Sequence, residues 1–329
     1  HYYPFFQKLT PIYAFENNKE YIDSAFIIYA SIIKAIWPNY HFFVFISLLI
    51  DAVLLHIFFK RYLPEKYYAL GFAVFLVFFG LILEVDLMRN VKSFLLFLVS
   101  LKYIQNKQFL NFILLNILGL FFHWSSLIFI PLYFFLHKSI SLKVFFIVFL
   151  IGNLIFLFEI SYVKPLIASF GHIIGGVYEE KISLYLASEI YSKEYGITIG
   201  YIERTMTSVF LMIYYNKILS QSKDKVIFIN SFFVFMVIYL YFSELSIMIS
   251  RVGALFSFSY WILWPKFLEI SSKSIRTMLF IMMCVFILLK INILTGNIFY
   301  SYDNKLFGKI KTYDERIEIF EKYKEQLIK

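Results

Sequence analysis

Residues 108–137, QFLNFILLNILGLFFHWSSLIFIPLYFFLH, hold no Asp, Glu, Lys or Arg in thirty positions. A helix needs about 20 apolar residues to cross a bilayer, so this stretch is too long for one span and short for two. The polar sequence HWSS begins at His123 near its middle, and Pro131 follows. We therefore predict two short membrane helices that turn at His123.

The composition of the whole chain is that of a membrane protein. Of its 329 residues 60% are hydrophobic and 16% are charged, whereas soluble domains have about 45–50% and about 25%. These values exclude a soluble globular protein and a disordered one. With 12 Gly, 7 Pro and 1 Cys, the chain is neither collagen-like nor a disulfide scaffold. The single Cys284 lies in an apolar run and allows neither a disulfide within the chain nor a thiolate metal site.

Ten apolar runs, separated by polar connections, account for most of the chain. They lie at about 41–59, 67–84, 91–104, 109–122, 125–137, 144–160, 206–219, 226–243, 252–268 and 277–297. We predict an all-α polytopic membrane protein with about ten visible transmembrane helices. These form a single membrane domain, residues 1–300, which a polar amphipathic tail follows at 301–329. Because the chain opens on His1 without a signal peptide, we expect that its true start is missing and that an eleventh helix lies upstream.

The charges of the connections predict the orientation in the membrane. The connections at 60–66, 102–107, 138–143, 217–225 and 266–276 hold 13 basic and 3 acidic residues. The alternate connections, at 85–90, 123–126, 161–205 and 244–251, hold 6 basic and 7 acidic residues. Basic loops favour the cytoplasm, so we place the first set inside and the second set outside. The same rule accounts for the net charge of +9, and we predict no nucleic-acid partner.

One outer connection, residues 161–205, is long enough to have a function of its own. Within it Val177–Tyr191 has helical apolar periodicity, and Glu20–Trp37 shows the same pattern near the start of the chain. We predict that both form amphipathic helices at the outer membrane interface. An ordinary surface loop is the alternative for the long connection. The tail also has helical periodicity, and its mixed charges decide little about its side of the membrane.

Two arginines lie at outer helix ends, where the positive-inside rule gives them no advantage. Arg89 follows Asp86 closely, and Arg251 follows Glu244. One interpretation is a local ion pair in each of these two segments. The other is a clamp for an anion, because the planar guanidinium group binds phosphate oxygens through two parallel hydrogen bonds.

His123 and Asp51 are two further polar residues that a membrane tolerates only for a reason. His123 lies on the same outer side as both arginines, where a histidine can move a proton near neutral pH. A satisfied structural histidine is the alternative. Asp51 lies in the middle of a predicted span, and we expect a structural polar contact in the bundle interior, toward His56, Lys290 or an unfilled polar position.

Several stretches resemble a known family. Residues 88–135, MRNVKSFLLFLVSLKYIQNKQFLNFILLNILGLFFHWSSLIFIPLYFF, are similar to the signature of EpsG-type, Wzy-class bacterial polysaccharide polymerases. This signature is an arginine that opens a helix, a short basic turn, and an apolar helix that ends in Phe-His before a small polar pair. The stretches KISLYLASE, GITIGYIER and ISRVGALFSFSYWILWP and the opening HYYPFF are similar too, so the resemblance covers nearly the whole chain. The family normally carries a first span, and often another outward arginine, ahead of the HYYPFF-like segment.

The resemblance implies a fold and an activity. Such proteins resemble lipid-dependent glycosyltransferases, with a GT-C type helical bundle and a long extracytoplasmic loop. They join oligosaccharide repeat units carried on undecaprenyl diphosphate into O-antigen, capsule or exopolysaccharide, on the outer face of the bacterial plasma membrane. The implied partners are this lipid-linked substrate, membrane lipid and a chain-length regulator. The diphosphate leaves without a nucleotide or a redox cofactor, and no carboxylate cluster has metal-ligand spacing, so we predict no required metal.

This chemistry gives each candidate residue a role. Arg89 and Arg251 would bind the diphosphate and stabilise its charge as it leaves. His123 would take the proton from the attacking hydroxyl, or orient that hydroxyl. His123, Arg89 and Arg251 are thus the predicted catalytic set. The predicted substrate-binding residues, all in the outer connections, are Lys181, Arg204, Tyr185 and Glu244.

Three other functions stay open. A flippase for the same lipid-linked sugars would need acids arrayed through the spans or an inverted repeat, and the sequence shows neither. A membrane O-acyltransferase that uses His123 ranks third, because the predicted topology places this residue away from cytoplasmic acyl donors. A ligase that joins finished polysaccharide to an acceptor lipid would use chemistry similar to that of a polymerase, and the sequence separates these two poorly.

Overall fold

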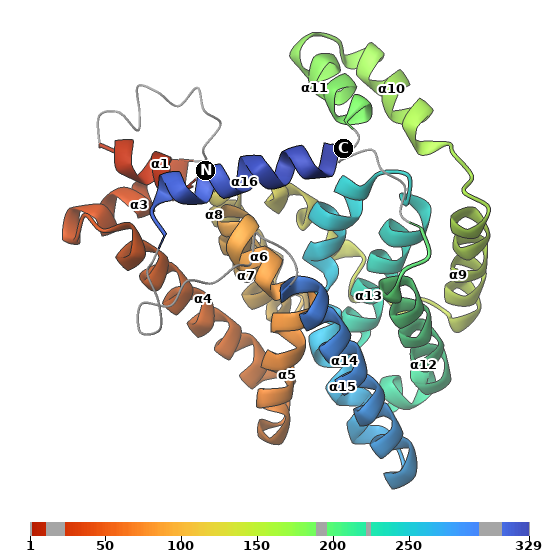
Figure 1. Ribbon diagram of the computed structural model, residues 1–329. Coiled ribbons are helices and arrows are strands. Elements are labelled where there is room, and N and C mark those ends of the chain that lie inside the picture. Colours follow the sequence, from red (N-terminus) through yellow and green to blue (C-terminus); the bar gives the residue numbers. More distant parts are fainter. Residues whose placement is uncertain (1, 11–23, 189–195, 222–224, 296–310, 329) are drawn as a thin grey trace. The chain divides into compact units, whose positions relative to one another are not determined.

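The computed structural model describes residues 2–10, 24–188, 196–221, 225–295 and 311–328, and every regular element among them is a helix (Figure 1). In chain order these are α1 (Tyr2–Lys8), α3 (Ser24–Ile36), α4 (Tyr40–Tyr62), η2 (Glu65–Tyr67), α5 (Tyr68–Phe75), η3 (Leu76–Gly80), α6 (Leu81–Asp86), α7 (Met88–Gln105), α8 (Phe109–Phe122), η4 (Trp124–Ile128), η5 (Ile130–Phe134), α9 (Leu142–Leu157), α10 (Val163–Ile174), α11 (Gly176–Ala187), α12 (Ile199–Gln221), α13 (Lys225–Tyr241), η6 (Met248–Val252), η7 (Gly253–Phe256), α14 (Phe258–Ile270), α15 (Lys273–Thr295) and α16 (Tyr313–Ile328). The predicted all-α fold is confirmed over these residues.

The apolar runs of the sequence coincide with helical segments. Three of these are long and apolar enough to cross a membrane, judged on the described residues: Tyr40–Tyr62, Glu65–Val85 and Lys273–Ile293. Shorter apolar helices include α8, α9 and α13. The helices indicate a multi-pass membrane protein, and the number of spans stays a prediction.

The predicted turn at His123 is present. Helix α8 ends at Phe122, and the 3₁₀ segment η4 begins at Trp124. Gly119 allows the returning chain to pack closely, because a Cβ atom there would lie 2.8 Å from the Ser126 hydroxyl oxygen and 3.3 Å from the Ser93 carbonyl. The Ser126 hydroxyl in turn donates to the Asn116 carbonyl at 2.7 Å. These contacts fix η4 against α8.

The chain divides into two compact units, His1–Ser271 and Ser272–Lys329. The second unit contains α15 and α16, and the helical periodicity of the tail is realised in α16. The predicted boundary near residue 300 lies in 296–310, outside the described residues, and stays a prediction. All candidate site residues lie in the first unit, which is described below.

The core of the first unit lies around α14. Nearly every residue of α14 is buried, in keeping with a sequence that is apolar on all sides. The Trp261 ring contacts the rings of Phe75 and Phe94, with centroid distances of 4.8 and 5.9 Å. Helices α5 and α7 therefore pack on this central helix, and they carry the segments that lead to the candidate site.

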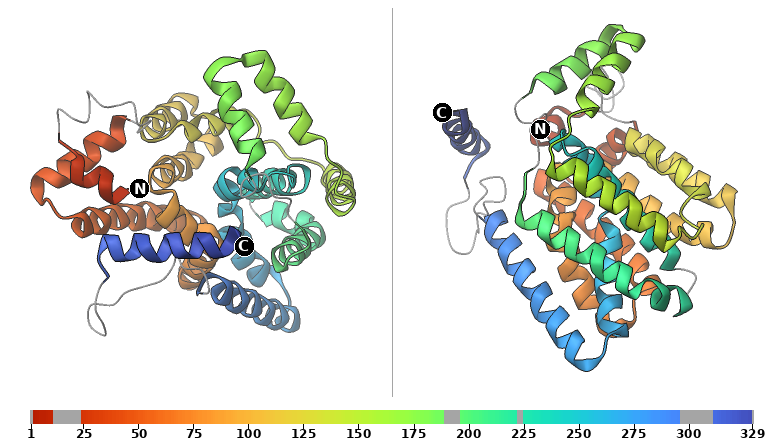
Figure 2. Two further views of the ribbon diagram at one scale, coloured as in Figure 1. Left: turned by 45° about the horizontal axis from the view of Figure 1, so that its top comes forward. Right: turned by 90° about the vertical axis from the view of Figure 1, so that its right-hand side faces the viewer.

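Hydrogen bonds join the basic connections to one another at one end of the first unit. The bonds run from Lys225 Nζ to the Tyr62 carbonyl (2.9 Å), from Lys217 Nζ to the Ile270 carbonyl (2.6 Å) and from Asn230 Nδ2 to the Lys138 carbonyl (2.6 Å). Connections that the charge pattern assigns to one side of the membrane thus lie together, and we call this the lysine-rich end. The opposite end of the helices carries α10 and α11, and we call it the site end (Figure 1 and Figure 2).

Candidate active site at the site end

His123 lies where α8 gives way to η4, with an extended backbone at φ −164° and ψ 139°. Its backbone N–H donates to the Gly119 carbonyl at 2.9 Å and closes the last turn of α8. Its Nδ1 accepts a hydrogen bond from the backbone N–H of Ser125 at 3.0 Å, so the imidazole caps the first turn of η4. The orientation of the ring is therefore set by the turn that its own sequence forms.

This hydrogen bond decides which nitrogen of His123 carries the proton. A ring nitrogen that accepts from an N–H presents its lone pair, so the neutral imidazole is protonated at Nε2. Nε2–H is a hydrogen-bond donor. A general base at Nε2 would need the other tautomer, which would set two N–H groups against each other at Nδ1. Of the two roles that the sequence allowed, the geometry favours orientation by a neutral donor over proton removal.

Arg89 and Arg251 lie near His123, although the three residues come from different elements. Arg89 is in the first turn of α7, and Arg251 is in η6. Burial, together with the positive charges of Arg89 and Arg251, lowers the pKa of His123 from 6.5 to about 4. Both guanidinium groups therefore act on the imidazole, which is neutral at pH 7. The structure brings the predicted catalytic set together.

The guanidinium group of Arg251 is available for a ligand. Arg251 is exposed, and it makes no hydrogen bond or ion pair with any residue that the structure describes. The alternative of an ion pair with Glu244 is therefore wrong for this arginine. The corresponding alternative for Arg89 is not decided, because the side chain of Asp86 lies outside the described residues.

The carboxylate of Glu244 is bonded to the start of α10. Its carboxylate accepts hydrogen bonds from the backbone N–H groups of Tyr162 (2.6 Å), Val163 (2.7 Å) and Lys164 (3.1 Å) and from the Ser161 hydroxyl (2.9 Å). Burial raises the pKa of this carboxyl group, but the four hydrogen bonds outweigh burial and hold the pKa below its ordinary value. Glu244 thus caps the N-terminus of α10, and its carboxylate is occupied.

We expect Glu244→Ala to release the first turn of α10 from the rest of the unit. The amide hydrogens of Tyr162, Val163 and Lys164 should exchange at least about tenfold faster, because each loses its acceptor. Hydrogen exchange read by mass spectrometry checks this, with the exposed Glu180→Gln on α11 as the matched control. The lowered pKa means that the wild-type cap is intact above the ordinary carboxyl range and is lost only as the pH falls through the lowered value. Unchanged protection in Glu244→Ala would contradict the capping function.

Arg204 lies inside the protein and not in a loop. It belongs to α12, which begins within the predicted outer loop, and it is only 6% exposed. Its guanidinium carbon lies 4.2 Å from the centroid of the Tyr239 ring, 5.5 Å from that of Phe235 and 5.8 Å from that of Phe79. Phe79 takes φ +70° in η3, where the helix between α5 and α6 is interrupted. An enclosed cation of this kind favours a role in joining α12, α13 and η3 over contact with a solvated sugar.

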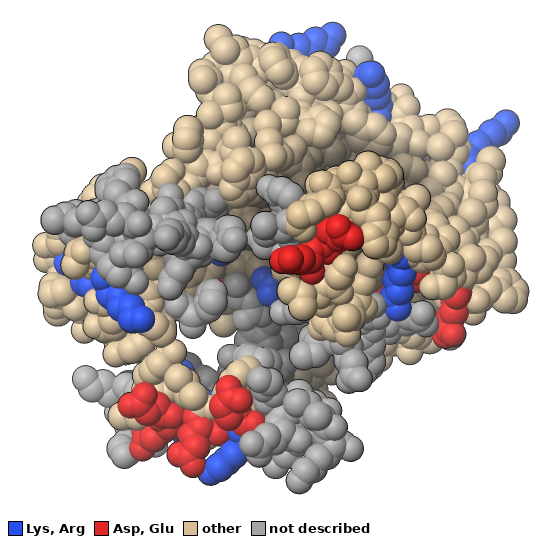
Figure 3. Space-filling model, turned by 90° about the horizontal axis from the view of Figure 1, so that it is seen from above, with Lys and Arg blue, Asp and Glu red and all other residues tan. Residues whose placement is uncertain are grey.

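The two remaining predicted substrate-binding residues lie on α11, which pairs with α10 at the site end. Tyr185 is 48% exposed and is accessible for stacking against a sugar. The side chain of Lys181 lies outside the described residues. His172 of α10 and Glu179 of α11 share a hydrogen bond of 2.6 Å that joins the two helices. Figure 3 looks onto this end, where charged side chains are sparse over the first unit.

A family model described as the EpsG family matches residues 1–304. The chain belongs to the EpsG family. This is a family of Wzy-type polysaccharide polymerases, so the resemblance seen in the sequence is confirmed. No curated protein and no solved structure gives a match.

In this EpsG-family chain the partner of Asp51 is neither of the two expected residues. Asp51 forms an ion pair with Lys92 of α7, and Glu84 of α6 lies close enough for the charges of both to act on it. His56 instead faces the ring of Tyr68, with a centroid distance of 6.2 Å. Lys92 itself is a signal for this pair in the sequence, since it follows Arg89 by three residues and is the charge deepest inside an otherwise apolar helix.

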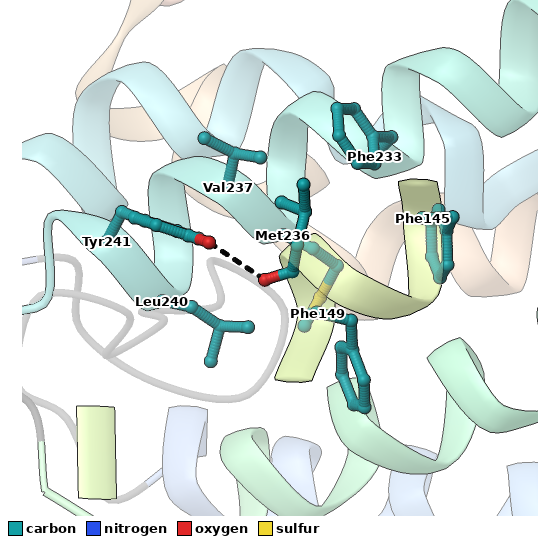
Figure 4. A pocket seen from close by; sticks show the side chains of 8 residues that line it. Phe145, Phe149, Phe233, Met236, Val237, Leu240 and Tyr241 are labelled. Atoms are coloured by element: carbon teal, nitrogen blue, oxygen red, sulfur yellow. Dashed lines mark hydrogen bonds between the residues drawn. The ribbon is translucent and has the colours of Figure 1, made fainter. Parts of the chain in front are cut away.

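An apolar hollow of about 190 Å³ lies between α9 and α13 (Figure 4). Phe145 and Phe149 line it from α9, and Met236 and Leu240 line it from α13. The Tyr241 hydroxyl at its edge donates to the Val148 carbonyl at 2.9 Å. No charged side chain lines this hollow, so it offers no group for the chemistry of the family.

Proposed function

We propose that this EpsG-family protein is a polymerase that joins undecaprenyl-diphosphate-linked oligosaccharide repeat units on the outer face of the bacterial plasma membrane. One observation carries the proposal: Arg89, Arg251 and the Nε2–H donor of His123 are grouped at the site end, opposite the lysine-rich end. Two guanidinium groups and a neutral donor suit the oxygens of a diphosphate. The all-helical architecture supports a GT-C type lipid-dependent glycosyltransferase.

The transfer is a substitution at the anomeric carbon of the growing chain. A hydroxyl oxygen of the incoming repeat unit forms a bond to this carbon, and the bond from the carbon to the diphosphate oxygen breaks. The electron pair leaves with the diphosphate, and the hydroxyl proton passes to solvent or to the released diphosphate. Arg89, Arg251 and His123 Nε2–H stabilise the charge that gathers on the leaving group.

The decisive experiment is incubation of the purified protein with a lipid-diphosphate repeat unit, followed by a ladder gel. A ladder of products supports the polymerase. A single transferred chain indicates a ligase instead, and translocation across vesicles without reaction indicates a flippase. The two guanidinium groups beside His123 at the site end favour a one-sided reaction over alternating access.

The proposed orientation makes its own prediction. Cysteine probes after residues 63, 105, 140, 221 and 271 should be labelled only from the cytoplasm, and a probe at 185 should be labelled from outside. Hydrogen bonds at the lysine-rich end support this expectation for the probes at 63, 140, 221 and 271, which should report together. Labelling of residue 185 from the cytoplasm would show that the orientation is the reverse of the one proposed. The site would then lie on the side away from the lipid-linked donor.

A further inference from the structure

A buried polar cluster lies next to the candidate site. The ammonium of Lys92 forms an ion pair with Asp51, and their side chains are only 4% and 2% exposed. The same ammonium donates to the Ser47 carbonyl at 2.9 Å. The carboxyl group of Glu84 lies close enough to this pair for the charges of Asp51 and Lys92 to act on it. We call Asp51, Glu84 and Lys92 the buried triad; its members come from α4, α6 and α7.

The ion pair keeps the buried charges balanced. Asp51 and Lys92 carry opposite charges, so the pair is neutral as a whole, which is the arrangement that a buried site tolerates.

The triad is connected to the active site on two sides. Lys92 follows Arg89 by one turn of α7, so the ion pair fixes the turn from which Arg89 projects. On the other side, the Lys92 ammonium lies 5.8 Å from the centroid of the Tyr29 ring. The Tyr29 hydroxyl shares a 2.7 Å hydrogen bond with Ser47 Oγ, and its ring lies 6.2 Å from that of Phe122, the neighbour of His123.

We propose that the buried triad positions Arg89 and His123 for the transfer reaction. The inference rests on the proposed function, and it assigns Asp51, Glu84 and Lys92 as positioning residues that do not touch the substrate. Apolar side chains would hold α4, α6 and α7 together at least as well, because a buried ion pair adds little to stability. The ion pair supplies direction instead, since its hydrogen bonds set the rotation of α7 and the place of Tyr29.

The test compares turnover per folded molecule in Lys92→Met and in the double variant Asp51→Asn/Lys92→Met. Lys92→Met leaves Asp51 able to take up a proton, and the double variant leaves no buried charge, so both should fold. We expect kcat about 10²-fold lower in both, with KM within a few-fold of wild type. Lys102→Met, on the same helix at the lysine-rich end, is the matched control.

A second measurement separates this inference from the proposed function. Undecaprenyl diphosphate should raise the melting temperature of the wild type, and the rise should shrink in Lys92→Met if Arg89 is displaced. Wild-type turnover per folded molecule in Lys92→Met, or in the double variant, would overturn the inference. A wild type that binds the lipid but forms no ladder would refute polymerisation, and the melting shifts would still decide whether the triad positions the site.

Discussion

Replacing Arg251 with lysine is expected to lower the polymerising activity about 10²–10³-fold while the protein still folds and inserts. The guanidinium of Arg251 is exposed, makes no hydrogen bond or ion pair within the part of the chain that the structure describes, and acts on His123 through its charge. Lysine keeps the charge but loses the planar fork that grips two phosphate oxygens at once. Ladder formation per folded molecule, measured in nanodiscs, gives the loss.

Two companion variants sharpen this experiment. Arg89→Lys should lose activity to a similar degree, since both guanidinium groups act on the same imidazole. Arg61→Lys is the matched control, because Arg61 is an exposed arginine at the lysine-rich end and should behave as wild type. Full activity in both Arg251→Lys and Arg89→Lys would leave these arginines a structural role only and would remove the diphosphate clamp from the proposed mechanism.

The helices of this protein are predictable from sequence because the signal is local. An apolar run long enough to cross a bilayer must satisfy its backbone groups within itself, and only a helix does so. The turn at His123 follows from the same logic, since the uncharged stretch is too long for one span and carries HWSS near its middle. Charge counts in the connections predicted which helix ends lie together, and the bond from Lys225 to the Tyr62 carbonyl joins two of them.

The pairing of side chains is not predictable in this way, because partners are distant in sequence. Lys92 and Asp51 are separated by 41 residues, and Glu244 caps a helix about 80 residues before it. The sequence offered an ion pair with the neighbouring Arg251 as one interpretation of Glu244, but its carboxylate accepts four hydrogen bonds from the start of α10 instead. Tertiary contacts also placed Arg204 among aromatic rings, where the sequence suggested an open loop.

His123 gives the prediction with the sharpest contrast between variants. His123→Ala should lower turnover about 10²–10³-fold, because it removes the Nε2–H donor from the leaving diphosphate. His123→Gln should retain most of the activity, because its amide N–H₂ can replace Nε2–H. A general base predicts the opposite, with glutamine nearly as inactive as alanine. His137→Gln, at an exposed histidine whose Nδ1 is hydrogen bonded to the Tyr133 carbonyl, controls for the substitution itself.

The pH dependence of the same variants tests the tautomer independently. With a pKa of about 4, His123 stays neutral from pH 7 to about pH 5, so activity should not fall across the ordinary histidine range. The free energy of unfolding should decrease as the pH falls from 6.5 towards about 4. In this range the histidine of the unfolded chain binds a proton, whereas His123 in the folded protein stays neutral. In His123→Gln the melting temperature should therefore change less with pH between 6.5 and about 4 than in the wild type. The shape of its pH–rate profile should be unchanged. If the wild-type pH–rate profile has a step near pH 6.5 that His123→Gln lacks, the result would contradict this tautomer and identify His123 as the proton acceptor.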